Sequence, residues 1–530
     1  MKKFKKIMAL AIAMVMVLGM STAVFAAPAT SQTIDENSAA NDQGKYIISV
    51  ASDDTHTYTV YQILTGTLVA GESKLGNPVW GADATGETGT NTGVDAFITS
   101  ITASGLSNAQ VNALVEAQLA SGATGQGTVT ASQSLEVAPG YYLIKDTTTT
   151  LEDGDAYSLN IVAVFNDITI TPKKGTTTSD KKVDDNDNDK ADNGTEWIDS
   201  ADYSIGDTVP YKLTATIADD YANYTKGYKL TFHDVMSAGL TFNSSSVVVK
   251  VGTTTIATEN YELVTEPTDG CTFEVKFANL KDISAVTAGS VITVEFNATL
   301  NSSAVIGVPG NPNTSHVTYT NNPNDAQAGE NGKTPDDKVI VFTYETVFNK
   351  VDSQNKPLTG ADFTLYKKVG ENWVDVTALH TGEGAQNPSK TVANLTNDNG
   401  TATNAKFTFA GLDAGDYKLV ETTTPTGYNT IADITFTITA EHQILSDNPQ
   451  LTSLIGAEGT TFTMTTVKEG EGEGEDATPT GELDADIQNQ QGTELPSTGG
   501  IGTTIFYVIG AILVLGAGIL LVTRRRMNAN

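Results

Sequence analysis

The chain has 530 residues and a formal net charge of −32, with 63 acidic against 31 basic side chains. This acidic balance argues against nucleic acid as a partner, because phosphates are bound by basic surfaces. The single cysteine, Cys271, excludes an internal disulfide. Thr, Ser, Gly and Asn abound and long helical patterns are few, so we expect a mainly β protein of about three domains at roughly 150 residues each.

Residues 1–26 are predicted to be a signal peptide. Four lysines among the first six residues precede an apolar segment from Ile7 to Met20. The small residues around Val24-Phe25-Ala26 offer a cleavage site before Ala27, as in secretory leaders. We therefore expect the mature chain to be exported and exclude the leader from the fold.

Residues 45–172 are expected to form a first domain of strands around a helical insertion. Apolar side chains alternate along 46–50, 58–60 and 142–144, which is the period of a strand. Residues 97–101 and 111–119 follow helical spacing, with Ser107 as the candidate N-cap. Residues 161–170 are predicted to form one closing strand.

Residues 180–336 are predicted to form a β-sandwich. Many short strands without crossover helices favour this fold. The strand-like runs, separated by turn residues, are 208–217, 229–232, 247–251, 272–277, 290–300 and 316–320. The stretch 324–337, rich in Asn, Asp, Gly and Pro, is predicted to be a linker.

Residues 338–494 are predicted to form a third domain, again a small sandwich. Its expected strands are 339–350, 362–367, 406–409, 416–421, 433–439 and a final strand at 486–489. The tract 469–476, in which Glu and Gly alternate, lacks apolar side chains and repels itself. We expect this tract to be an exposed loop before the last strand.

The C-terminal residues combine three features: the motif Leu495-Pro496-Ser497-Thr498-Gly499, an apolar run at 505–522, and a basic tail at 523–530. The run is just long enough to span roughly 30 Å of hydrocarbon at about 1.5 Å per residue, and the arginines after it favour a cytoplasmic C-terminus. This order resembles the cell-wall sorting signal of Gram-positive surface proteins, in which a sortase cuts between Thr and Gly. The resemblance implies that Thr498 becomes joined to an amine; the alternative is a plain membrane anchor.

The first domain ends in Ile168-Thr169-Ile170-Thr171-Pro172-Lys173. This run resembles the pilin motif of backbone pilins in Gram-positive sortase-assembled pili, usually written Val-Tyr-Pro-Lys. The resemblance implies that the Lys173 amine attacks the thioester formed on Thr498 of another subunit, which requires an accessible lysine that an enzyme can deprotonate. Thr171 stands where the family prefers Tyr, and Lys174 is an adjacent competitor. A solvated linker lysine is the alternative.

Three runs of the middle domain hold further candidates: Asp180-Lys181-Lys182-Val183, Phe232-His233-Asp234-Val235 and Tyr319-Thr320-Asn321. In this order they resemble pilin domains that form an intramolecular Lys-Asn isopeptide bond. The resemblance implies Lys181 as nucleophile, with Lys182 as its rival, Asn321 as electrophile and Asp234 as catalytic acid. Such chemistry needs burial, which keeps the amine neutral and the carboxyl protonated. Singly, these residues could also be solvent-facing or begin turns.

The third domain holds a similar set: Val347-Phe348-Asn349-Lys350-Val351-Asp352, Gly415-Asp416-Tyr417-Lys418-Leu419-Val420-Glu421 and Ile487-Gln488-Asn489. These runs resemble the first, the glutamate-bearing and the terminal strand of a collagen-adhesin B-type (CnaB) domain. The resemblance implies Lys350 as nucleophile, Asn489 as electrophile and Glu421 as proton donor. Alternation places Glu421 on one face with Tyr417 and Leu419, so it can point inward. An exposed strand carboxylate is the alternative for Glu421.

Other sites find less support in the sequence. In the first domain Asp146 stands past the expected place and no convincing Asn accompanies it, so we predict no internal bond there. Asp185, Asp187, Asp189 and Glu196 have the spacing of a calcium loop, but Lys190 occupies the position where an EF-hand needs Gly. A solvated acidic loop is therefore expected. The five histidines show no metal spacing, and we expect no metal and no cofactor.

The combined pattern predicts tandem immunoglobulin-like β-sandwich domains of the CnaA and CnaB types in a shaft-forming pilin on a Gram-positive cell surface. Its expected partners are pilin-specific and housekeeping sortases, identical subunits, accessory pilins and peptidoglycan. The chain would be a sortase substrate and no enzyme, apart from its own autocatalytic bond formation. The alternative is a monomeric wall-anchored adhesin or minor pilin, in which Lys173 has no function.

Overall fold

The structure is a computed structural model, and it describes residues 30–35, 44–69, 75–103, 106, 108–151, 155–172, 175–185, 197–323, 329, 332–380, 393–396, 402–458, 463–469, 478–492 and 501–527. The predicted leader, Ser107, Lys173, Lys174 and the sorting motif 495–499 lie outside these residues. So does most of the acidic tract. Of the candidate calcium ligands, only Asp185 is described.

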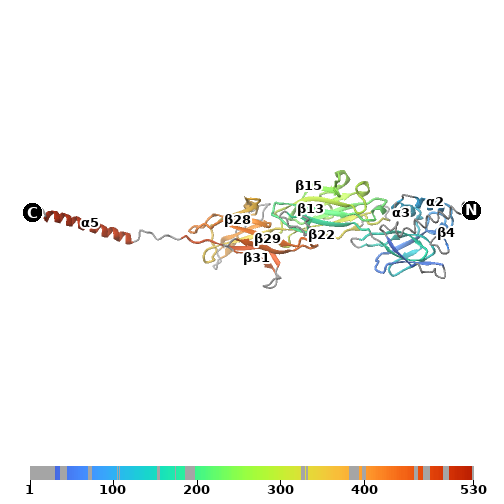
Figure 1. Ribbon diagram of the computed structural model, residues 1–530, viewed down its shortest axis with the longest axis horizontal. Coiled ribbons are helices and arrows are strands. Elements are labelled where there is room, and N and C mark those ends of the chain that lie inside the picture. The colour runs from blue at the N-terminus through green and yellow to red at the C-terminus, as the bar shows by residue number, and fades with distance from the viewer. Residues whose placement is uncertain are drawn as a thin grey trace.

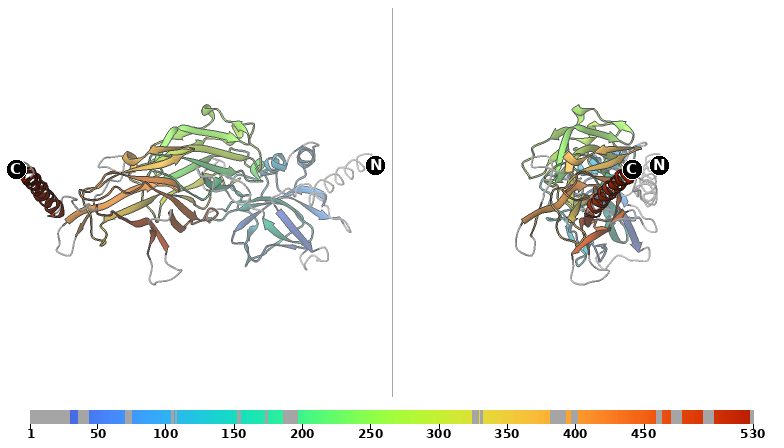
Figure 2. Two further views of the ribbon diagram at one scale, coloured as in Figure 1. Left: turned by 60° about the vertical axis from the view of Figure 1, so that its left-hand side comes forward. Right: turned by 90° about the vertical axis from the view of Figure 1, so that its left-hand side faces the viewer.

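The described chain consists mainly of strands in three successive pairs of sheets, which confirms the predicted fold class. Figure 1 shows the three units in a row, with the first domain at one end and helix α5 (Ile501–Met527) at the other. The two views in Figure 2 show the same elongated arrangement. The described N-terminal and C-terminal elements therefore lie at opposite ends of the molecule.

The first domain has one sheet in the order β1-β9-β2-β6 and another in the order β4-β3-β7-β8, with β5 paired to β3. Its elements are β1 (Thr30–Asp35), β2 (Tyr46–Val50), β3 (Tyr58–Leu68), β4 (Leu75–Trp80), α2 (Val94–Ile101), α3 (Asn108–Glu116), β5 (Gly127–Val129), β6 (Leu135–Val137), β7 (Gly140–Asp146), β8 (Leu159–Val164) and β9 (Asp167–Pro172). The predicted helical insertion is present as α2 and α3. The single strand predicted over 161–170 is wrong: the chain bends at Phe165 and Asn166, so β8 and β9 enter different sheets.

The middle domain is a sandwich of two sheets, ordered β11-β10-β13-β19-β15-β16 and β12-β22-β20-β14-β18-β17, with β21 paired to β20. Its strands are β10 (Thr178–Asp184), β11 (Trp197–Ile198), β12 (Ser200–Asp202), β13 (Thr208–Thr216), β14 (Leu230–Met236), β15 (Leu240–Val251), β16 (Thr254–Thr255), β17 (Glu262–Val264), β18 (Phe273–Phe277), β19 (Val291–Leu300), β20 (Asn311–Tyr319), β21 (Gly332–Lys333) and β22 (Asp337–Phe342). Short 3-10 helices occur at Tyr221–Asn223, Thr258–Asn260 and Leu280–Asp282. Inward aromatic side chains such as Tyr211, Phe232 and Phe296 form one core between the sheets.

The C-terminal domain pairs two five-stranded sheets, ordered β26-β27-β23-β32-β31 and β25-β24-β28-β29-β30. Its elements are β23 (Tyr344–Val351), β24 (Asp362–Val369), β25 (Asn372–Asp375), α4 (Thr377–His380), β26 (Ala393–Thr396), β27 (Ala402–Leu412), β28 (Gly415–Thr423), β29 (Ile434–His442), β30 (Leu451–Glu458), β31 (Met464–Glu469) and β32 (Thr478–Gln488). The short terminal strand predicted at 486–489 is the end of the longer β32. Strands β23 and β32 run parallel at the centre of their sheet.

Strand β22 joins the middle and C-terminal domains. The sequence predicted one strand over 339–350 in the third domain, but β22 pairs with β12 and β20 of the middle domain before β23 begins the next one. Because side chains alternate along a strand, Val339 and Val341 pack into the middle core, whereas Ile340 and Phe342 pack into the C-terminal core. The two cores therefore share one strand and cannot separate without exposing its apolar side chains.

Buried hydrogen bonds reinforce the same junction. Tyr344 Oη donates to Asp202 Oδ2 at 2.9 Å, and Ser204 Oγ donates to Asp413 Oδ1 at 2.8 Å. Each bond joins one side chain of the middle domain to one of the C-terminal domain. Separating the domains would break both hydrogen bonds. Because a buried polar group is costly to leave unpaired, these bonds oppose the separation. The two domains are therefore joined both by a shared strand and by buried hydrogen bonds.

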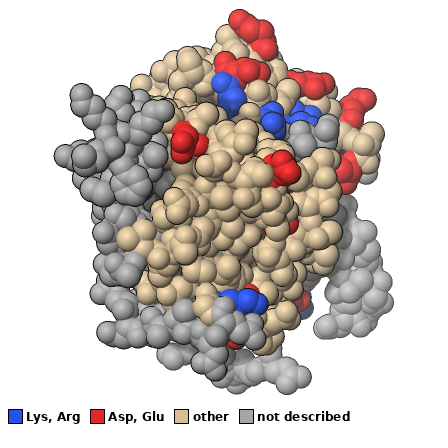
Figure 3. Space-filling model, turned by 90° about the vertical axis from the view of Figure 1, so that its right-hand side faces the viewer, with Lys and Arg blue, Asp and Glu red and all other residues tan. Residues whose placement is uncertain are grey.

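The outer end of the first domain faces the viewer in Figure 3. Among the described residues, most acidic side chains gather toward the top and right of this face with a few basic side chains among them, other charged side chains are scattered, and most of the remaining surface is uncharged. A polyanion such as nucleic acid would need a continuous basic surface. The face drawn in Figure 3 offers none among the described residues, in agreement with the acidic composition.

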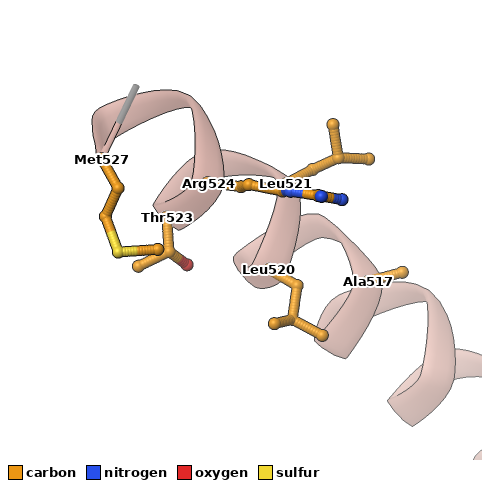
Figure 4. A pocket seen from close by; sticks show the side chains of 6 residues that line it. All are labelled: Ala517, Leu520, Leu521, Thr523, Arg524 and Met527. Atoms are coloured by element: carbon orange, nitrogen blue, oxygen red, sulfur yellow. The ribbon is translucent and has the colours of Figure 1, made fainter. Parts of the chain in front are cut away.

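Helix α5 follows the C-terminal domain. Within the described part of the chain, Ile505–Met527 is the one helical segment long and apolar enough to span a membrane, with a mean hydropathy of 2.8. Figure 4 shows Leu520, Leu521 and Arg524 projecting from the helix near its end, and these side chains are exposed. The predicted span 505–522 lies inside this helix, whose last turn carries the three arginines.

Candidate functional site

In the C-terminal domain the structure brings Lys350, Glu421 and Asn489 together. Lys350 lies near the end of β23 opposite Ile487 of β32, and Asn489 directly follows β32. Glu421 comes from β28 in the facing sheet. Lys350 Nζ contacts Asn489 Oδ1 and lies 3.5 Å from Glu421 Oε1. Asn489 Nδ2 donates to Glu421 Oε1 at 3.0 Å, so the amine, the amide and the carboxyl touch one another.

These three side chains are removed from water. Lys350 and Asn489 are fully buried, and only 6% of Glu421 is exposed. Burial lowers the pKa of the Lys350 amine, although the nearby Glu421 carboxylate opposes this by favouring the charged form. Thr424 Oγ1 and the Ile431 amide each donate to Glu421 Oε2 at 3.2 Å. The carboxyl is therefore fixed beside an amine that tends to be neutral.

This geometry suits the formation of an amide bond between Lys350 and Asn489. As a neutral Lys350 amine attacks Asn489 Cγ, the Nζ–Cγ bond forms, the Cγ–Nδ2 bond breaks, and Nδ2 leaves as ammonia. The amine loses one proton and the leaving nitrogen gains one, so no co-reactant is needed. The Glu421 oxygens face Nδ2, at 3.0 and 3.3 Å, which places this carboxyl to pass the proton to the leaving group.

In the middle domain the structure brings Lys181 and Asp234 together. Lys181 Nζ on β10 donates to Asp234 Oδ2 on β14 at 2.5 Å, and both side chains are fully buried. The amine lies 5.6 Å from the ring centroids of Tyr211 and Phe296. Lys182, the predicted rival, is partly exposed and pairs with two carboxylates at 2.6 and 2.9 Å. Strand alternation thus turns Lys181, and not Lys182, into the core.

Burial favours the uncharged forms of this pair. It lowers the pKa of the Lys181 amine and raises the pKa of the Asp234 carboxyl, in each case against the attraction of the partner's charge. A proton passed from the amine to the carboxyl leaves both groups neutral. In that state the amine is a nucleophile and the acid can donate a proton.

The structure does not bring Asn321 to this pair, so the sequence prediction for Asn321 is corrected. Asp234 lies opposite Ser315 of β20, six positions before Asn321. At roughly 3.3 Å per residue this is about 20 Å along the strand. Asn321 Nδ2 instead donates to the backbone oxygen of Asp155 at 3.3 Å, and the backbone oxygen of Asn321 accepts from the Tyr157 amide at 2.9 Å. Asn321 therefore joins the middle domain to the first.

Asn313 is the amide that reaches Asp234. It lies on β20 two positions from Ser315, the residue opposite Asp234, and so faces the same core. Asn313 is fully buried, and its contact with the Asp234 carboxyl lowers the pKa of that group. Apart from this contact, its Nδ2 and Oδ1 have no hydrogen-bond partner among the described residues. Because such a buried amide is costly, Asn313 is the candidate electrophile.

A sequence signal for Asn313 existed, but the predicted strand ended too soon to include it. The prediction began this strand at residue 316, whereas β20 begins at Asn311. Along the observed strand every second side chain is buried, and Asn313 shares the inward face with Val317 and Tyr319. An amide between apolar inward positions requires a buried polar partner. That rule, applied to the full strand, would have selected Asn313.

In the first domain Asp146 is paired with a histidine. His56 Nδ1 lies 2.5 Å from Asp146 Oδ2, and His56 Nε2 lies 2.8 Å from Asp155 Oδ2. Burial by itself lowers the pKa of His56, but the two carboxylates outweigh it and the pKa is raised. The lysine next to Asp146 along β7, Lys145, pairs with Glu116 at 2.6 Å. Asp146 therefore serves an ion pair with His56 rather than a lysine.

The chain combines tandem β-domains that hold buried lysines with a C-terminal motif and helix that resemble a wall-sorting signal. These features are those of a wall-anchored surface protein, and comparisons with known families agree with that class. Residues 205–323 match the Cna-B-like domain of Gram-positive pilin backbone subunit 2. Residues 345–449 match the prealbumin-like fold domain SpaA, and residues 487–529 match the LPXTG cell wall anchor motif. The last match covers the predicted sorting motif and α5.

The individual relatives share fewer than a third of their aligned residues with this chain. The trypsin-resistant surface T6 protein of Streptococcus pyogenes serotype M6 is 29% identical over 380 residues, which are 61% of this chain and 65% of that protein. Among solved structures, the T6 backbone pilin of the same serotype has 18% identity and a TM-score of 0.45, covering 85% of this chain and 98% of that one. The major pilin SpaD of Corynebacterium diphtheriae has 18% identity, a TM-score of 0.43 and the same coverage.

Two of these matches agree on the kind of protein. The chain matches a Gram-positive pilin backbone family in its middle domain and the LPXTG cell-wall anchor at its C-terminus. It is exported and anchored at the Gram-positive cell surface. Its alignment with the T6 protein spans just under two thirds of that relative.

Intact-mass spectrometry of the full chain in detergent tests both internal bonds. We expect the processed chain to weigh less than its sequence by two ammonia molecules. Glu421→Ala should recover one of them, because the proton transfer that releases Asn489 Nδ2 is lost. Asp416→Ala, on the same strand and more exposed, is the control and should keep the full deficit. A wild-type mass equal to the sequence mass would contradict the chemistry.

A matched pair of variants tests which amide reacts in the middle domain. Asn313→Ala should recover the mass of one ammonia, because it removes the only amide that reaches the Lys181–Asp234 pair among the described residues. Asn321→Ala makes the same chemical change at the domain junction and should leave the deficit unchanged. Each mass is compared with that of the variant's own sequence. The opposite result would restore Asn321 as the electrophile.

Proposed function

We propose that this chain is the shaft subunit of a covalently polymerised pilus. A pilin sortase would join Thr498 of one copy to the Lys173 amine of the next, and a housekeeping sortase would attach the finished polymer to peptidoglycan. The observation that carries this proposal is the pair of buried Lys–acid–Asn sets in the domains between Lys173 and Thr498. Identical subunits are then the main partners, and the shaft supports adhesion.

The positions of these sets fit a chain that is pulled along its length. Lys181 comes eight residues after Lys173, and Asn489 comes nine residues before Thr498. Tension between two linkage points would therefore meet a cross-link shortly after entering the middle domain and shortly before leaving the C-terminal domain. The described part of the first domain, which ends with β9 at Pro172, precedes Lys173 and lies outside this path.

The domain organisation supports Lys173 as the linkage point. Strand β9 closes the first domain and β10 opens the middle domain, so Lys173 belongs to the connection between them. We propose the domain limits as residues 30–172, 175–342 and 344–492. Compared with the sequence prediction, this moves β22 from the third domain to the middle one.

Polymer formation beside the cognate pilin sortase tests the linkage. Lys173→Ala should abolish the ladder of high-molecular-weight species on a denaturing gel, because no amine remains to accept the thioester on Thr498. Lys174→Ala is the matched control and should keep the ladder. A ladder that survives Lys173→Ala and disappears with Lys174→Ala would move the linkage by one residue. A ladder unaffected by either change would contradict Lys173 as the linkage point, and the absence of any ladder from the wild-type chain would favour a monomeric adhesin or minor pilin.

A further inference from the structure

Three side chains with metal-binding atoms meet on the outer face of the seven-stranded sheet of the middle domain. We call His233, Asp269 and Cys271 the His233 cluster, and Glu274 contacts its histidine. His233 on β14 and Glu274 on β18 are directly opposite in the antiparallel register and so share a face. Asp269 and Cys271 lie in the loop that leads into β18. The cluster therefore draws on β14 and one loop, and Glu274 flanks it from the neighbouring strand.

The donor atoms of the cluster are close together. His233 Nδ1 lies 3.0 Å from Asp269 Oδ2, 3.1 Å from Glu274 Oε1 and 3.7 Å from Cys271 Sγ. Cys271 Sγ lies 3.3 Å from Asp269 Oδ2. Gly270 between the two loop residues has a φ of 94°, a left-handed conformation that glycine adopts readily. The Cys271 amide donates to Asp269 Oδ1 at 3.0 Å, which leaves Oδ2 facing the cluster.

These separations are those of a tetrahedral zinc site. Zn²⁺ binds sulfur at about 2.3 Å and nitrogen or oxygen at about 2.0–2.2 Å, which places N and O about 3.4 Å apart and S about 3.6 Å from either. The separations among the donor atoms of His233, Asp269 and Cys271 run from 3.0 to 3.7 Å. These three atoms could thus bind one ion after shifts of a few tenths of an ångström, which leaves the fourth tetrahedral position to water.

Neighbouring groups orient the donors for this purpose. His233 Nε2 lies 2.9 Å from Thr318 Oγ1, so a proton on Nε2 can be donated to Thr318 while the Nδ1 lone pair faces the cluster. A bound histidine usually makes such a bond through its other nitrogen. Lys276 Nζ lies 2.8 Å from Glu274 Oε2, and that ion pair holds the second carboxylate oxygen, Oε1, toward His233.

We propose that the His233 cluster binds one Zn²⁺ ion per chain. A thiolate, an imidazole and a carboxylate suit Zn²⁺, whereas Ca²⁺ and Mg²⁺ prefer oxygen ligands alone. The sequence predicted no metal site because His233 and Asp269 are 36 residues apart, outside any short ligand spacing. By binding residues of both, the ion links the loop before β18 to strand β14. This inference is independent of the proposed polymerisation.

Metal titration of the untagged full chain in detergent, stripped beforehand with a chelator, tests the site. We expect saturation at one Zn²⁺ per chain by calorimetry. Co²⁺, used as a spectroscopic probe, should give a thiolate-to-metal charge-transfer band. Cys271→Ser should abolish that band and weaken Zn²⁺ binding at least tenfold, because the thiolate is the strongest donor of the set.

A matched pair of carboxylate variants distinguishes a specific Zn²⁺ site from general electrostatic attraction of the cation to an acidic surface. Asp269→Asn should weaken Zn²⁺ binding at least tenfold. Asp336→Asn removes the same charge from a residue that pairs with His316 on β20, beside His233, and should leave the affinity unchanged. The proposal is overturned if binding does not saturate, if Cys271→Ser and Asp269→Asn bind as the wild type does, or if Asp336→Asn weakens binding equally.

Discussion

The removal of two lysine amines from water is the constraint on which this structure depends. A buried charge that lacks a partner costs several kcal/mol. Each buried lysine must therefore either pair with a carboxylate or lose its proton and become neutral. Lys350 and Lys181 each lie beside one acid, Glu421 and Asp234, within an apolar core. Because burial lowers the pKa of both amines, the same environment that makes these lysines costly also makes them nucleophilic.

Covalent bonds at these positions would remove the buried amine and increase the free energy of unfolding of each domain. Lys350 and Asn489 are 139 residues apart along the chain, and by the loop-entropy relation used for disulfides a cross-link of this span is worth about 5 kcal/mol. A chain whose single cysteine can form no internal disulfide gains the same kind of constraint from amide bonds. Strands β23 and β32 run parallel, so pulling the start of one and the end of the other loads the C-terminal domain in shear.

The sequence was sufficient for the fold class and for the C-terminal site, because Lys350, Glu421 and Asn489 lie in runs that resemble known strands closely. It failed where position along a strand decides which groups meet. Asn321 satisfied the expected order of residues, yet the register of β14 and β20 places Asn313 beside Asp234. Strand β22 was assigned to the wrong domain because both of its faces are apolar, and the pattern cannot say that the two faces serve different cores.

The central claim is that tension between Lys173 and Thr498 passes through cross-linked domains that cannot extend. Stretching single polymers by atomic force microscopy tests it directly. The account predicts no unfolding step that releases residues 182–312 or 351–488, since each segment would be bypassed by a covalent bond. Steps of roughly 450 Å, the extended length of about 130 residues at about 3.5 Å each, would contradict it.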